Sequence, residues 1–198
     1  MKLFFLITFQ VLIIYSNQAQ KREVIFDVAL NDKYIGTLHA TEEKTGNKFI
    51  RDLKSNTDAK VIILSIHVES EVTNTHEGDV LVTGVAYRHA NRGVKDVKSN
   101  VKRLSSRNYQ CERNGIISHL KNTEISFCTV NLYWIEPSGI KKVFSTMFVT
   151  FLPIKVLGPG KYEFVNPENR SAIYTYTNGK LSRIEMDTPV GKVISTRK

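Results

Sequence analysis

The stretch VIILSIHVESEV, residues 61–72, alternates apolar and polar side chains along most of its length. In an extended chain, Leu64, Ile66 and Val68 point to one side, while His67 and Glu69 point to the other. Such alternation is typical of a strand with one face packed on a core and the other face meeting water or a polar interior. We therefore predict a half-buried β-strand within an antiparallel sheet.

Similar alternation occurs on both sides of this stretch, and short groups of turn-forming residues separate the runs. The further predicted strands cover residues 24–31, 34–44, 48–57, 79–89 and 94–103. Two Asn-Gly pairs, Asn114-Gly115 and Asn178-Gly179, predict hairpins later in the chain, because both residue types tolerate the positive φ of a type I′ turn.

Residues 124–134 fit either a strand or a short helix, since Ile125, Cys128 and Leu132 are spaced as on a helix. Sequential hairpins without crossover helices predict an antiparallel meander. The predicted fold is all-β, with about ten or more short strands and at most one short helix. A sheet of this length tends to curl, so the meander is expected to form a barrel, a half-barrel or a sandwich.

The N-terminus has the three-part order of a secretory signal peptide. Lys2 is positive, residues 3–15 are apolar except for Thr8 and Gln10, and Ala19 is a small residue at a suitable cleavage point. The apolar run is shorter than the ~20 residues of a spanning helix. We expect residues 1–19 to be a signal peptide. Residues 20–198 would then be one exported all-β domain, periplasmic or extracellular, without a transmembrane helix in the mature chain.

The chain is basic, with 28 Lys and Arg against 19 Asp and Glu, a formal net charge of +9. Much of the excess lies between Arg88 and Arg113. A basic stretch can bind an anionic envelope component such as lipid head groups or acidic polysaccharide, or it can be an ordinary solvated face. Export and the lack of a recognisable binding module argue against nucleic acid. The candidate residues for an anionic surface are Arg92, Lys95, Lys98, Lys102 and Arg103.

Other chemistry has weak support in the sequence. Cys111 and Cys128 are an even pair that an oxidising compartment could bridge, and buried free thiols are the alternative. His67 and Glu69 share a strand face, but a zinc site needs three or four ligands. The chain contains neither Gly-x-Ser-x-Gly nor His-Glu-x-x-His. We therefore predict no catalytic residues, no metal site and no cofactor.

Three groups of short motifs occur in an order that resembles a family of exported bacterial β-rich proteins of unknown function. The first pairs FDV at 26–28 with IGTL at 35–38, and the second is LYWIEP at 132–137. The third is GKY at 160–162 followed by YTYTNGKL at 174–181. The resemblance implies a periplasmic or exported barrel-like domain. It carries no established activity, so no functional residue is transferred.

Aromatic residues gather near these motifs and are the candidate ligand-binding residues: Tyr133, Trp134, Phe144, Phe148, Tyr174 and Tyr176. Inside a curled sheet such side chains either fill the core or line an apolar pocket. The working hypothesis is a non-catalytic exported β-domain that binds an apolar or amphipathic ligand or a cell-envelope component. An envelope-acting hydrolase and a purely structural or interaction module are the alternatives. The sequence specifies no oligomeric state.

Overall fold

A computed structural model of the chain describes residues 19–61, 64–92 and 95–198. The expected signal peptide lies outside the described residues, apart from Ala19. Within these ranges, none of the helical segments has the length and apolar character needed to span a bilayer. The described residues form 14 antiparallel strands in a single sheet, together with one short 3-10 helix.

The first half of the sheet consists of long strands followed by shorter ones. They are β1 (Gln20–Leu30), β2 (Lys33–Thr45), β3 (Lys48–Val61), β4 (Leu64–Glu77), β5 (Val80–Ala90), β6 (Val97–Ser105), β7 (Asn108–Arg113) and β8 (Ile116–Leu120). The 3-10 helix η1 (Thr129–Tyr133) follows. The second half is β9 (Lys142–Ser145), β10 (Thr150–Gly158), β11 (Lys161–Val165), β12 (Ser171–Thr177), β13 (Lys180–Thr188) and β14 (Gly191–Arg197).

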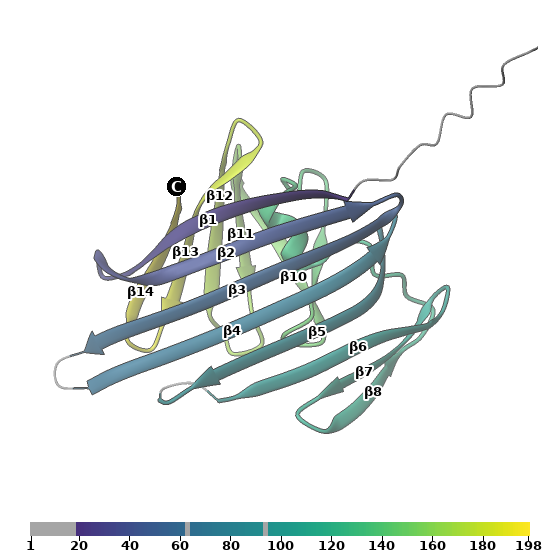
Figure 1. Cartoon of the computed structure of the whole chain (residues 1–198), viewed down its shortest axis with the longest axis horizontal. Helices are drawn as coiled ribbons and strands as arrows, with labels where there is room; N and C mark the ends of the chain where they lie inside the picture. Colours follow the sequence, from purple (N-terminus) through teal and green to yellow (C-terminus); the bar gives the residue numbers. More distant parts are fainter. Residues whose placement is uncertain (1–18, 62–63, 93–94) are drawn as a thin grey trace, which may run out of the picture.

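Each strand pairs with its neighbours along the chain, and β1 pairs with β14 to join the two halves. The sheet order runs from β8 through β1 and β14 to β9, so β8 and β9 are its edges and the sheet is not closed. Figure 1 shows the long strands β1–β5 crossing in front of β10–β14, with η1 behind them. The prediction of an all-β antiparallel meander is confirmed.

Local sequence explains the strands and turns. In β1 the apolar residues Val24, Phe26, Val28 and Leu30 are buried, whereas the residues between them are partly exposed. Both predicted Asn-Gly hairpins form: φ is 51° at Asn114 and 81° at Gly115, and 51° at Asn178 and 71° at Gly179. These positive values are those of a type I′ turn, whose twist matches that of the flanking strands.

The ambiguous stretch at 124–134 contains a 3-10 helix of five residues. The Asn131 side-chain oxygen accepts a hydrogen bond from the Cys128 backbone amide at 3.3 Å, which holds the first turn. Val130 and Leu132 are fully buried, and they belong to two different apolar clusters of the core. The helix therefore packs into the interior between the two halves of the sheet.

Candidate functional site

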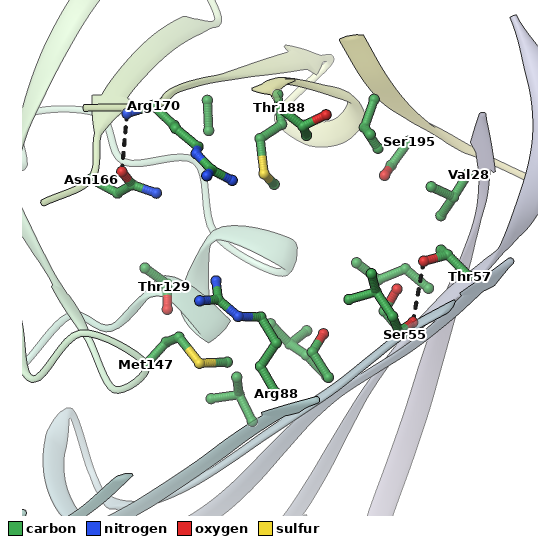
Figure 2. A pocket seen from close by; sticks show the side chains of 18 of the residues that line it. Val28, Ser55, Thr57, Arg88, Thr129, Met147, Asn166, Arg170, Thr188 and Ser195 are labelled. Atoms are coloured by element: carbon green, nitrogen blue, oxygen red, sulfur yellow. Dashed lines mark hydrogen bonds between the residues drawn. The ribbon is translucent and has the colours of Figure 1, made fainter. Parts of the chain in front are cut away.

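A cavity of about 380 Å³ lies between the two halves of the sheet. Strands β1–β5 line one side of it, β10–β14 line the other, and Thr129, Leu132 and Tyr133 of η1 contribute as well. Figure 2 shows side chains from both halves pointing into the same open space. The direct pairing of β1 with β14 joins the two halves of the sheet that enclose the cavity.

Short side chains on the inner face of β3 and β4 leave this space unfilled. Ser55 of β3 lies opposite Ser70 of β4, and Thr57 lies opposite Val68. These four residues line the cavity. The interior of a small curled sheet is normally filled by large apolar side chains, so a row of serine, threonine and valine produces a hollow instead.

The rest of the lining is mostly apolar. Aliphatic and aromatic side chains come from nearly every strand around the cavity, among them Val28, Leu38, Leu152, Phe164 and Met186. Hydroxyl and amide groups are interspersed, including Thr188, Ser195 and Asn166. Among the described lining residues, every charged side chain is an arginine, and these are Arg88, Arg92 and Arg170.

The six aromatic residues of the sequence hypothesis divide between cavity and core. Tyr133, Phe148 and Tyr174 line the cavity. Phe144 is fully buried, and its ring meets that of Phe151 edge-on at 5.2 Å.

The other two aromatic residues belong to the core. Tyr176 is buried and donates a hydrogen bond to the Leu132 carbonyl oxygen at 2.7 Å. Trp134 packs against the same cluster, and the Arg22 guanidinium lies over its ring at 4.5 Å. Three of the six aromatic residues therefore line the cavity, and the other three fill or pack against the core.

The lining tyrosines are neutral hydrogen-bonding groups. Burial raises the pKa of Tyr174 to about 12, and burial likewise raises the pKa of Tyr133 well above its ordinary value. A buried phenol loses the hydration that would stabilise its charged form. At neutral pH both phenols therefore stay protonated and uncharged, and their rings contribute aromatic surface to the cavity.

The predicted basic patch does not form a single cluster. Lys98 and Lys102 are exposed on the outer face of β6, where they alternate with buried residues. Arg103 has the opposite parity and pairs with Glu77 at 3.0 Å. Arg92 lines the cavity, and Lys95 offers its backbone carbonyl to a neighbouring arginine. Alternation along β6 separates Lys98 and Lys102 from Arg103, because successive side chains of a strand point to opposite faces, while Arg92 and Lys95 precede the strand.

Both cysteines are buried free thiols that pack in the same apolar cluster. Burial raises the pKa of Cys111 to about 11 and that of Cys128 to about 12. His67 contacts Asp58 at 2.8 Å on the outer face. No group of three or more metal-ligating side chains occurs among the residues that the structure describes.

Arg88 and Arg170 are charged lining residues that were not among the candidates from the sequence. Arg88 follows Gly84 and Ala86 at the parity of the inner face of β5, which was a usable signal. A long basic side chain at a core-facing position has to find a polar interior or a partner. Arg170 lies in the turn before β12, and nothing in its local sequence points toward a cavity.

Comparison with known protein families gives a match over most of the chain. A family model described as "Domain of unknown function (DUF6134)" matches residues 26–198, the greater part of the chain. No curated protein and no solved structure matches.

Proposed function

Since the chain belongs to the DUF6134 family, a domain of unknown function, we propose its function from the site alone. The protein binds one apolar or amphipathic ligand in the cavity between the two halves of its sheet. The observation that carries this proposal is the cavity of about 380 Å³ with a mainly apolar lining. Small-molecule sites are typically concave, apolar hollows of roughly 300–1,000 Å³ with a few placed polar groups.

The motifs that suggested an exported family also support this site. Ile35 and Leu38 come from the IGTL motif, Leu132 and Tyr133 come from LYWIEP, and Tyr174 opens YTYTNGKL. All five residues line the cavity. Together with the signal-like N-terminus, they support a protein that works in the periplasm or outside the cell. There a cavity could shield an apolar molecule from water.

The lining favours binding over hydrolysis, the alternative function. Its described side chains are aliphatic, thioether, aromatic, hydroxyl, amide or guanidinium groups. Such groups enclose and orient a molecule. Hydrolysis of envelope glycans or esters typically needs a pair of carboxylates, or a nucleophile with an adjacent base.

A pair of adjacent substitutions on β4 tests the proposal. Val68 lines the cavity, whereas the next residue, Glu69, lies on the opposite face of the strand. Val68→Trp should fill the space opposite Thr57 and lower the affinity for the fluorescent apolar probe N-phenyl-1-naphthylamine at least about tenfold. Glu69→Trp, the matched control, should bind like the wild type.

The measurement is a fluorescence titration at a temperature where circular dichroism shows all three proteins folded. Overpacking costs about 1–3 kcal/mol, which a domain of this size can tolerate. Unchanged probe affinity in folded Val68→Trp would contradict a ligand site in this cavity.

A further inference from the structure

The side chains that line the cavity have a net positive charge, which indicates the charge of its ligand. Three arginines line it, and the other described lining residues are neutral. Two of the arginines come from opposite walls: Arg88 from β5 and Arg170 from the turn before β12. Figure 2 shows the Arg88 guanidinium reaching up beside Thr129, and the Arg170 side chain extending into the cavity from the opposite side.

Arg88 is held in place but incompletely satisfied. Its side chain is only 14% exposed. Its Nη2 donates to the Lys95 carbonyl oxygen at 3.0 Å and to a Glu168 carboxylate oxygen at 3.3 Å. Its Nε is buried without a hydrogen-bond partner among the described residues. A buried guanidinium donor without an acceptor is costly, so the protein's own groups do not satisfy all the donors of Arg88.

The acidic groups nearby do not balance the arginines. Glu168 faces both Arg88 and Arg170, and its distance to the Arg170 Nε is 4.0 Å, too long for a hydrogen bond. Asp96 also interacts electrostatically with Arg88, although its oxygen atoms accept hydrogen bonds from the His89 ring and the Ala90 amide. Two carboxylates, Glu168 and Asp96, stand against the three arginines that line the cavity, so the lining keeps a net positive charge.

Resting on the proposed function, we propose that the ligand is an amphipathic anion with a carboxylate or phosphate-monoester head on one apolar chain. Arg88 and Arg170 hold the head, because guanidinium forks match the oxygen atoms of both groups. The chain lies along the apolar lining toward Val28 and Val193, where β1 and β14 meet. About 380 Å³ is near the lower end of the usual range for ligand sites, which fits one chain better than two.

The test compares dodecyl compounds that differ only in their head. Dodecanoate, dodecyl phosphate and dodecanol are titrated by calorimetry, below micelle formation, into delipidated protein prepared from the full chain. At least one of the anions should bind about 10- to 100-fold more tightly than dodecanol, the advantage expected for charge-assisted hydrogen bonds. The tighter anion identifies the head group.

Variants assign the preference to the arginines. In the double variant Arg88→Gln with Arg170→Gln, the anions should lose about 10- to 100-fold in affinity while dodecanol binding stays unchanged. Lys98→Gln removes one positive charge from the exposed outer face and is the matched control, with no expected change. The comparison of acid and alcohol binding uses the wild-type protein alone. It therefore tests the anionic head group even when the double variant does not fold.

The outcomes separate the two proposals. Equal affinity for the acid and the alcohol would contradict the proposal of an anionic head group but not the proposal of an apolar ligand site. Anion preference that persists in the folded double variant would overturn the assignment to Arg88 and Arg170. Binding of none of the three compounds, together with no binding of the apolar probe, would overturn both proposals.

Discussion

His76 should make the protein sensitive to acid. It is fully buried on β4, and both of its ring nitrogens are without hydrogen-bond partners among the residues described. Burial, assisted by the positive charge of Arg51, lowers its pKa from 6.5 to about 3. The folded protein therefore keeps this ring neutral at pH values where the unfolded chain protonates it.

The direction in which the free energy of unfolding changes with pH follows from the number of protons that each state binds. Between pH 6.5 and about 3 the unfolded state holds one more proton at His76 than the folded state. The free energy of unfolding therefore falls as the pH drops through this window. Each pH unit contributes about 1.4 kcal/mol, so at pH 4.5, two units below 6.5, the loss is about 2.7 kcal/mol.

Substitution of His76 by leucine isolates this contribution. Urea unfolding of the wild type and His76→Leu is followed by circular dichroism at pH 8 and pH 4.5. The wild type should lose about 2–3 kcal/mol more stability than the variant, because all other titrating groups are common to both proteins. An equal loss in the two proteins would refute the reasoning, since it would mean that folded His76 takes up its proton as readily as the unfolded chain.

Two further predictions concern the buried charge and the thiols. Glu42 pairs with the buried Arg51 at 2.6 Å and with the half-exposed Arg22 at 2.7 Å. Glu42→Gln should lower the free energy of unfolding in urea by about 3–5 kcal/mol, because it leaves the buried Arg51 cation without its ion-pair partner. Arg22→Gln should lower it by less than about 1 kcal/mol, because this arginine is half-exposed. Equal losses in the two variants would contradict this prediction. Cys111 and Cys128 should react slowly with iodoacetamide in the native protein and both should react rapidly in urea without reductant, since burial raises their pKa values. Mass spectrometry counts the labels, and two unreactive thiols in urea would instead indicate a disulfide.

The strand pattern was predictable wherever one face is apolar and the other polar. The hairpins at Asn114-Gly115 and Asn178-Gly179 are local, because two residues determine the turn. The last residue of β3 was harder to predict from the sequence. It was predicted at residue 57, but the strand continues to Val61. Ser55 and Thr57 face the cavity, so the inward face there does not look apolar in sequence.

The cavity itself could not be predicted from local patterns. It depends on pairing between β1 and β14, such as Leu30 with Val193, from opposite ends of the chain. The alternation of side chains along the strand did predict that Lys98 and Lys102 lie on one face of β6 and Arg103 on the other. It could not show that Phe144 fills the core while Phe148 lines the cavity, because that depends on which strand of the other half faces each ring.

Photolabelling tests the central claim, that the cavity holds an apolar chain. A dodecyl chain with a diazirine near its end, prepared as the acid and as the alcohol, is bound, irradiated and located by peptide mass spectrometry. We predict labels on lining residues such as Leu38 and Leu152, competed by excess unlabelled compound and lost in Val68→Trp. Labels concentrated on exposed residues such as Tyr87 and Ile117, and unaffected by Val68→Trp, would contradict the account.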